Sequence, residues 1–268
     1  MVNGKYNIMN DKTKYPIVLV HGMLLKDFKL YRSFRKIRDH IKNVGYKVYA
    51  TNQDGIGSIE NNAKQIKEEI LKILEIEDVD KVNIIAHSKG GLDARYMISM
   101  LEMENHVASL TTLSTPHYGS KLSSTILKMP KWLAKFLAFW INLVYKIFKD
   151  KKPDILKLAY ELTDTHMINF NEKVINSPLV YYQSYSASLD NKKSFLMLLP
   201  YKITKILEKD QTDGIVSVSS STWGEYKGNI PNDYDHLKMV GAYGGKKSLK
   251  EVANFYIEII NDLKEMEF

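Results

Sequence analysis

Residues 82 to 90 place a serine at the end of an apolar, β-branched run. The run Val-Asn-Ile-Ile-Ala-His precedes Ser88, and Lys89 and Gly90 follow it. A small-x-Ser-x-Gly pattern after a buried strand makes a tight strand-to-helix turn with serine at its apex, since the two backbones pass close together there. Ala86 takes the first small position, where glycine is more common. The pattern therefore predicts Ser88 as a nucleophile, and the alternative is an ordinary surface serine in a loop.

His236 is the histidine that best fits the role of a base for this serine. A serine hydroxyl becomes nucleophilic when a base accepts its proton, and a third group must orient the base. With this type of turn the chain order is serine, acid, histidine, and the histidine lies on a late loop. His236 lies in such a polar loop near the C-terminus, and the alternative is a solvated loop histidine. His87 is expected to be a packing or hydrogen-bonding scaffold. Three further histidines fall in predicted helices or at their ends: His40, His106 and His166.

Asp213 is the preferred acid. A carboxylate at a strand edge, followed by glycine as here, can reach an imidazole from the C-terminal side of a sheet. The alternative for Asp213 is a surface aspartate in a turn. Three other aspartates compete for the role, and the last two are too near His236 in sequence to approach the far nitrogen of its ring easily: Asp210, Asp233 and Asp235.

Two backbone N–H groups are predicted to stabilise a developing oxyanion. One donor is expected from the residue after the nucleophile, Lys89. The other is expected from the loop after the first strand, where His21-Gly22-Met23 makes Met23 the candidate. Glycine before the donor lets the backbone turn towards a substrate. The alternative for this triplet is a plain turn that ends a strand.

These residues must be positioned by alternating strands and helices. Apolar β-branched runs predict strands, and apolar residues at helical spacing predict helices between them. Such alternation indicates an α/β fold with a mostly parallel central sheet and helices on both faces. With no internal repeat and no low-complexity linker, residues 1–268 are expected to form one domain. The predicted strands are 16–20, 46–50, 82–86, 110–113 and 179–182, and the predicted helices are 28–43, 59–75, 90–103 and 247–264.

Composition excludes several classes of function. The chain has 268 residues and no cysteine, so it has no disulfide, thiolate metal site or cysteine nucleophile. The net charge is +7, and residues 121–152 supply all of it with eight lysines and one acid. Nucleic-acid binding is disfavoured, because arginines are few and the basic excess lies on an apolar segment. The N-terminus has no apolar run of the signal-peptide kind, which fits a cytoplasmic protein or the mature part of a secreted one.

Five sequence blocks together resemble those of bacterial true lipases, and they occur in that family's order over almost the whole chain. The resemblance implies an α/β-hydrolase fold and hydrolysis of carboxylic esters of lipids. It assigns Ser88 as nucleophile, Asp213 as acid and His236 as base, and the elbow alanine resembles the variant of bacillus-type lipases. The blocks are 15–23, 86–91, 114–120, 213–216 and 235–237.

One departure from that family concerns a metal. Many relatives bind a structural calcium through an acidic residue two positions after the catalytic histidine. Here that position is Lys238, whose ammonium group would repel a cation. Asp190 could match another calcium-binding aspartate, but one carboxylate does not make a site. We therefore expect no calcium at this place, no metal ligands and no cofactor.

The lysine-rich segment is predicted to carry a lid. Pro130 suits the first turn of a helix, and the positions that follow leave one narrow polar stripe on an otherwise apolar, aromatic helix. The uninterrupted apolar stretch, 136–141, is far shorter than the roughly 20 residues that span a bilayer. In the resembling family the matching region is a mobile lid, so residues 121–176 are expected to be a helical lid insertion. The alternatives are a fixed dimer or core helix and a permanent membrane anchor. The residues expected at a lipid interface are Trp132, Phe136, Phe139, Trp140 and Leu143.

The function predicted from these observations is a serine carboxylic-ester hydrolase of the lipase type. It would cleave acyl esters through an acyl-enzyme, with activation at the lipid–water interface contacted by the basic apolar helix. A monomer is favoured. One alternative is a phospholipase or lipid acyltransferase with the same triad, since the lysines would attract anionic head groups. Another is a catalytically silent membrane-binding protein on a hydrolase scaffold.

Overall fold

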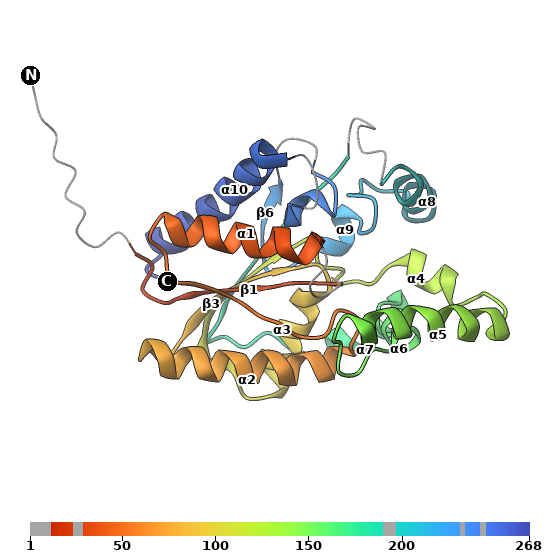
Figure 1. Ribbon diagram of the computed structural model, residues 1–268, viewed down its shortest axis with the longest axis horizontal. Helices are drawn as coiled ribbons and strands as arrows, with labels where there is room; N and C mark the ends of the chain where they lie inside the picture. The colour runs from red at the N-terminus through yellow and green to blue at the C-terminus, as the bar shows by residue number, and fades with distance from the viewer. Residues whose placement is uncertain (1–11, 24–28, 190–196, 231–233, 242–244) are drawn as a thin grey trace, which may run out of the picture.

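The architecture is a single six-stranded sheet with helices on both faces (Figure 1). It comes from a computed structural model that describes residues 12–23, 29–189, 197–230, 234–241 and 245–268. The strand order is β2-β1-β3-β4-β5-β6, and every neighbouring pair is parallel. The strands are β1 (Ile17–Val20), β2 (Val48–Ala50), β3 (Val82–His87), β4 (Val107–Leu113), β5 (Tyr181–Ser186) and β6 (Glu225–Asn229).

The predicted strands are all present, with shifted ends, and β6 is a strand that the sequence pattern did not indicate. Its residues, Glu-Tyr-Lys-Gly-Asn, are mostly exposed because β6 is at the edge of the sheet. An edge strand buries little, so it lacks the apolar run by which the central strands are recognised.

Two hydrophobic cores cover the two faces of the sheet. Helices α1 (Lys29–Asn43) and α10 (Gly245–Glu265) lie on one face, and α2 (Ile59–Glu77) and α3 (Lys89–Met100) lie on the other (Figure 1). Successive strand residues point to opposite faces, so Ile17 and Leu19 join the first core while Val18 and Val20 join the second. Both faces of β1 are therefore apolar, as expected of a central parallel strand.

Helix α2 illustrates how the sequence sets the ends of these helices. The side chain of Ser58 accepts a hydrogen bond from the backbone N–H of Asn61, which caps the first turn. Ala63, Ile66 and Ile70 form its buried stripe at helical spacing. The helix stops at Asp78, which takes the left-handed conformation (φ 51°) and donates its N–H to Leu74 O.

Register brings three strand ends to the same edge. Val20 of β1 pairs with Ala86 of β3, and His87 pairs with Leu113 of β4. The next residues of β3 and β4 are Ser88 and Ser114, and β1 continues into His21 and Gly22. The segments that were expected to carry the chemistry therefore emerge side by side at the C-terminal edge of the sheet.

The remaining helices lie mostly beyond this edge (Figure 1). Residues 121–176, between β4 and β5, contain four of them, and the described residues between β5 and β6 contain two more. Within the described ranges, no helix has both the length and the apolar character needed to cross a membrane. The six helices are α4 (Lys121–Ile126), α5 (Lys131–Ile147), α6 (Ile155–Glu161), α7 (Asp164–Lys173), α8 (Leu198–Glu208) and α9 (Val218–Ser221).

Candidate active site

Ser88 occupies a strained turn between β3 and α3. Its backbone has φ 56° and ψ −136°, a conformation that a residue with a side chain adopts only when its surroundings enforce it. The Ser88 N–H donates to Leu113 O at 2.9 Å, and the Ser88 carbonyl accepts the Thr115 hydroxyl at 2.8 Å. A Cβ added to Gly90 would lie 2.5 Å from His21 O, which explains the need for a small residue there. These contacts hold the serine at the apex of the turn.

The side chains of Ser88, His236 and Asp213 form one continuous hydrogen-bonded chain. Ser88 Oγ lies 2.8 Å from His236 Nε2, and His236 Nδ1 lies 2.7 Å from Asp213 Oδ2. Asp213 is fully buried, and the other two side chains are nearly so. In this arrangement the imidazole can accept a proton from the serine while its other nitrogen donates to the carboxylate.

Asp213 reaches the imidazole from a turn, not from the strand edge that the sequence suggested. An isolated antiparallel bridge between Thr212 and Ser217 closes this turn. Asp213 Oδ1 accepts the backbone N–H groups of Ile215 and Val216, at 2.9 and 2.8 Å, which leaves Oδ2 for the histidine. The Asp213 carbonyl also accepts the His236 backbone N–H at 3.1 Å. The loop therefore fixes both residues relative to each other.

The competing aspartates have other partners. Asp210 accepts the backbone N–H groups of Gln211 and Ser219, and Asp235 accepts those of Leu237 and Lys238. Asp233 lies outside the described residues. Asp235 thus holds the two residues that follow His236, whereas Asp213 is hydrogen-bonded to the His236 ring itself.

The loop after β1 lies directly against the serine. A Cβ added to Gly22 would lie 2.7 Å from Ser88 Cβ and 3.2 Å from Ser88 Oγ, so only glycine fits. The Gln53 side chain donates to His21 O at 2.7 Å and holds the loop in place. Met23 follows this contact and is 40% exposed, and Lys89 begins α3, where the first N–H groups have no acceptor within the helix. Gly22 and Ser88 are therefore in close contact, and each is followed directly in sequence by a candidate oxyanion donor, Met23 and Lys89 respectively.

His87 packs against the back of the site. Its ring lies 4.6 Å from the His236 ring, centroid to centroid, and is buried. Burial lowers the pKa of His87 well below its usual value, and the neighbouring His236 adds to the effect. Neither ring nitrogen has a hydrogen-bond partner among the described residues. Of the two scaffold roles expected for His87, the structure supports packing.

A buried arginine, which no sequence pattern singled out, ties α3 to the helices beyond the sheet. The Arg95 guanidinium lies 3.7 Å from the centre of the Trp223 ring, and His117 stacks on the same ring. Arg95 also donates to Asn171 Oδ1 and Val174 O. Burial lowers the pKa of Arg95 to about 9 and that of His117 well below its usual value. This cluster anchors α7 and the loop after β4 close to the serine turn.

No metal site is formed by the described residues, among which no group of three or more histidine, aspartate or glutamate side chains converges. Lys238 Nζ lies 4.4 Å from the centre of the Tyr234 ring, next to His236 in sequence. Asp190, the other candidate calcium ligand, lies outside the described residues. The expectation that no calcium binds beside His236 stays a prediction.

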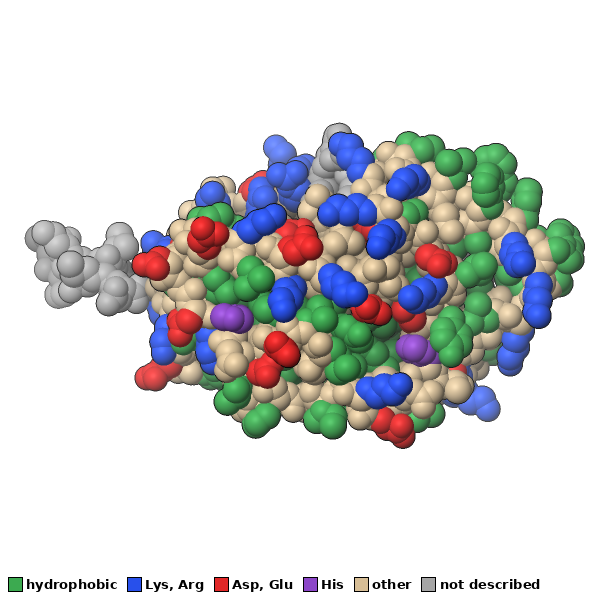
Figure 2. Space-filling view, turned by 90° about the horizontal axis from the view of Figure 1, so that it is seen from below, with side chains coloured by type: hydrophobic (Ala, Val, Ile, Leu, Met, Phe, Trp, Pro, Cys, Tyr) green, Lys and Arg blue, Asp and Glu red, His purple; other side chains and the backbone are tan. Residues whose placement is uncertain are grey.

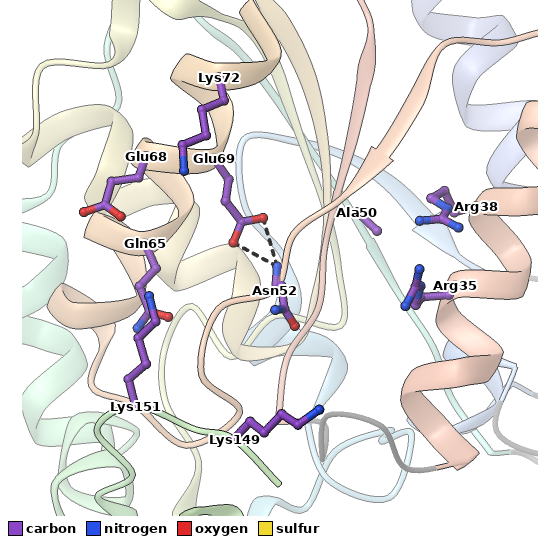
Figure 3. A pocket seen from close by; sticks show the side chains of 10 residues that line it. All are labelled: Arg35, Arg38, Ala50, Asn52, Gln65, Glu68, Glu69, Lys72, Lys149 and Lys151. Carbon is purple, nitrogen blue, oxygen red and sulfur yellow. Dashed lines mark hydrogen bonds between the residues drawn. The ribbon is translucent and has the colours of Figure 1, made fainter. Parts of the chain in front are cut away.

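Two surface cavities are described, and neither is lined by the triad side chains. The larger, of about 490 Å³, lies beside β2 between α1 and α2; Arg35 and Arg38 line it from α1, and Lys72 and Glu69 line it from α2 (Figure 3). The smaller, of about 380 Å³, is lined by residues of the segments around Tyr118 and Ser219. Ser88 itself is 8% exposed.

Helix α5 presents an apolar face to solvent near this edge. Of its residues only Ala138 is buried, whereas Trp132 is 72% exposed and Phe139 is 62% exposed. Figure 2 shows apolar side chains gathered at this end of the molecule with lysines among them. All of the side chains expected at a lipid interface are exposed: Trp132, Phe136, Phe139, Trp140 and Leu143.

Comparison with known proteins relates the chain to ester hydrolases. Residues 16–153 match the family model of palmitoyl protein thioesterase. The sequence is 33% identical over 255 residues to triacylglycerol lipase 2 of Saccharomyces cerevisiae. The aligned region covers 87% of this chain and 73% of that protein. It is 25% identical over 292 residues to a triacylglycerol lipase of Pseudomonas fragi, covering 94% and 97% of the two chains.

A solved structure shares the fold. The crystal structure of a metagenomic carboxyl esterase superposes with a TM-score of 0.72 at 19% sequence identity, over 92% of this chain and 76% of that one. At this identity the likeness shows the fold alone.

Proposed function

We propose, starting from the fact that this chain belongs to the lipase family of α/β-hydrolases, that Ser88 is the nucleophile with which it cleaves acyl esters of lipids. The chain is an ester-hydrolysing enzyme of the lipase or esterase type. The single observation that supports the assignment of the nucleophile is the hydrogen-bonded chain from Ser88 through His236 to Asp213, at 2.8 and 2.7 Å.

Acylation would begin with nucleophilic attack and proton transfer, which together form a tetrahedral intermediate. Ser88 Oγ attacks the ester carbonyl while His236 Nε2 takes the hydroxyl proton. Asp213 keeps Nδ1 protonated and stabilises the positive charge that forms on the ring. The tetrahedral intermediate collapses when His236 returns the proton to the alkoxide, so that the alcohol leaves and Ser88 carries the acyl group.

Deacylation would use the same groups. His236 removes a proton from water, the hydroxide attacks the acyl-enzyme, and the carboxylic acid leaves as Ser88 is protonated again. In both halves the carbonyl oxygen becomes negative, and the backbone N–H groups of Met23 and Lys89 are the proposed donors to it. The contact of Gly22 with Ser88 supports this assignment of the first donor, since it places the loop beside the reacting atom.

The chemistry is tested with an activity-based probe. A fluorophosphonate should label the wild-type chain, and Ser88→Ala should lose both labelling and ester hydrolysis. Ser109→Ala is the matched control, because Ser109 is a buried strand serine bonded to Asn83 and should keep both activities. Labelling that persists in Ser88→Ala would overturn the assignment of the nucleophile.

The acyl donor is tested with a matched panel. p-Nitrophenyl esters of increasing chain length, one corresponding thioester, a triglyceride emulsion and anionic phospholipid vesicles would be compared. We expect lipid esters to be preferred over the short soluble ester. Release of fatty acid from the phospholipid alone would favour the phospholipase alternative, and preference for the thioester would follow the thioesterase model that the first half matches.

We propose further that residues 121–176 act as a lid, with α5 as its lipid-contacting helix. The proposal is supported by the exposed apolar face of α5 and by the small exposed fraction of Ser88. Insertion of that face into lipid would bury apolar area that now meets water. Activity on a poorly soluble ester should then rise sharply once the ester forms an emulsion. A plain hyperbolic dependence through the solubility limit would contradict the lid.

A further inference from the structure

The residue after the proposed nucleophile carries a charge into the protein interior. Lys89 Nζ pairs with Asp93 Oδ1 at 2.6 Å, one helical turn further along α3, and both side chains are only 1% exposed. Removing an ammonium and a carboxylate from water is expensive, and the attraction between them often does not repay the cost. Stabilisation of the fold is therefore a weak explanation for a buried charge pair at this position, and a role in the function of the turn is an alternative explanation.

The pair is attached to the neighbouring helix. Asp93 Oδ2 accepts the side-chain amide of Asn62 on α2 at 3.0 Å. The same amide group donates to Asp54 O at 2.7 Å. Burial raises the pKa of Asp93 to about 6, although Lys89 opposes that shift. Lys89 is thus held through its side chain by a chain of contacts that runs from α3 to α2 and the loop before it.

The chain of contacts continues to the segment that follows the C-terminus of α5. The Asp54 carboxylate accepts the backbone N–H groups of Lys151 and Lys152, both at 2.7 Å. In the other direction Asp150 accepts the Ile56 N–H at 3.0 Å. The loop that receives Asn62 is therefore fixed to the segment just after α5, so the position of Lys89 is tied to a part of the molecule well outside the turn.

The position of Lys89 matters because its backbone N–H is a proposed oxyanion donor. On the substrate side of the turn, Ser88 is held through its own N–H and carbonyl by Leu113, Gly91 and Thr115. Lys89 is the first residue of α3, and its side chain adds a further contact, with Asp93 one turn along the same helix. A donor must point at the oxyanion to within a small angular error, and a displacement of about 1 Å can cost about a hundredfold in rate.

We infer that the buried Lys89–Asp93 pair, anchored by Asn62, is a positioning device that aims the Lys89 backbone N–H at the oxyanion. Neither side chain touches the substrate, because both are buried and bonded to each other. They are positioning residues and not catalytic ones. This inference rests on the proposed function, in which that N–H is one of the two donors.

Three variants test the inference. Asp93→Asn keeps the shape and removes the counter-charge, Lys89→Met removes the ammonium, and Lys89→Met with Asp93→Leu removes both charges together. The measurements are Tm, kcat and KM on a short soluble ester, and the affinity for a trifluoromethyl ketone, which forms an anionic adduct with a serine and so reports on the donors.

The double variant separates positioning from stability. Each single variant should lower Tm, since it leaves a buried charge unpaired, and the double variant should recover Tm. We expect kcat to stay lowered by about tenfold to a hundredfold in the double variant, with KM within about twofold and ketone affinity lowered in parallel with kcat. Recovery of kcat together with Tm would overturn the inference, and so would a loss of kcat without loss of ketone affinity.

Two controls complete the design. Glu77→Gln alters a carboxylate at the far end of α2, one that pairs with Lys47 and accepts the Tyr49 hydroxyl, and it should leave kcat unchanged whatever it does to Tm. Fluorophosphonate labelling of the wild-type chain, lost in Ser88→Ala, is measured first. If that fails, the proposed function is wrong; if it holds and the double variant regains full kcat, only the positioning role is wrong.

Discussion

At the scale of single residues, the site depends on buried polar groups, each held by a small number of specific contacts. Asp213 uses one carboxylate oxygen for two backbone N–H groups and the other for His236. His87 packs on the same imidazole with no hydrogen bond among the described residues. Small chemical changes at these two positions should therefore have large and distinct effects.

Asp213→Asn should lower kcat by about three to four orders of magnitude on any ester, because an amide cannot keep the His236 ring in the required tautomer. Its size matches that of the carboxylate, so Tm should change little compared with kcat. Steady-state kinetics and thermal unfolding of the same samples check this. A variant with more than a tenth of the wild-type kcat would show that another group orients the histidine.

The free energy of unfolding should fall as pH drops below about 6.5, the usual pKa of an unfolded histidine. His87 and His117 have lowered pKa values in the folded chain, so there they stay neutral while the unfolded chain takes up protons. Each contributes stability that is present above that pH and is lost below it, by about 1.4 kcal/mol per pH unit. Urea unfolding at pH 7.5, 6.5 and 5.5 measures the slope.

His87→Phe is the matched test of that slope, since phenylalanine keeps a ring against His236 and cannot titrate. On acidification the free energy of unfolding should fall less steeply in the variant than in the wild type, by about 1.4 kcal/mol per pH unit, which corresponds to one proton fewer taken up on unfolding. Asp93, whose raised pKa acts in the opposite direction near pH 6, is common to both proteins and cancels in the comparison. Equal slopes would mean that folding does not lower the pKa of His87.

At the scale of elements, α5 is the helix whose environment does not match its composition. Its apolar face is exposed, and one of the contacts that attach it to the segment before α6 is polar, with Asn142 Oδ1 accepting the Ile155 N–H at 2.9 Å. An apolar helix with one polar stripe and lysines near both ends is suited to a lipid–water interface. The apolar side chains of α5 would then be covered by lipid and not by the rest of the protein.

Replacing Trp132 and Phe139 with serine should lower activity on an emulsified ester by about tenfold or more, because two large side chains no longer enter the lipid. Activity on a short soluble ester should change by less than about twofold. Ile76→Ser is the control, since Ile76 is 70% exposed on α2 and lies outside residues 121–176. Equal losses on both substrates would instead indicate that α5 supports the fold of the site.

At the scale of the whole molecule, the sheet is what gathers the site. Gly22, Ser88, Asp213 and His236 are spread over most of the chain, and their segments meet at or beyond the C-terminal edge of the strands. The positive charge is concentrated in residues 121–152, close to this same edge in the fold (Figure 1). The molecule thus has one end that combines the proposed nucleophile, the apolar helix and the excess of lysines.

A chelator should leave activity and Tm unchanged. The position two residues after His236 carries Lys238, and the described residues contain no cluster of three metal-ligating side chains. The measurement compares kcat and Tm after dialysis against EDTA with those after calcium is added back. Activity lost to the chelator and restored by calcium would show a site that involves residues outside the described ranges.

The sequence by itself determined the order of the elements and the chemistry available to them. The β-branched run before Ser88 predicts a strand, and the small residues on both sides of the serine predict a tight turn into a helix. Small residues are needed because the backbones of the strand and the helix pass close together at this turn. Predictions of this kind succeed because they depend on contacts between residues near each other in the chain. For His236 and Asp213 the prediction came from residue type and order along the chain, and the family resemblance assigned the same two residues.

Only the tertiary structure decided which distant groups meet. The turn that presents Asp213, the edge strand β6 and the buried pair of Lys89 and Asp93 depend on packing between segments far apart in sequence. Lysine in a helix ordinarily indicates a solvated face, so nothing local marks Lys89 as buried. The exposure of α5 was also left open by its composition, since an apolar helix can be covered by a core, by a partner or by lipid.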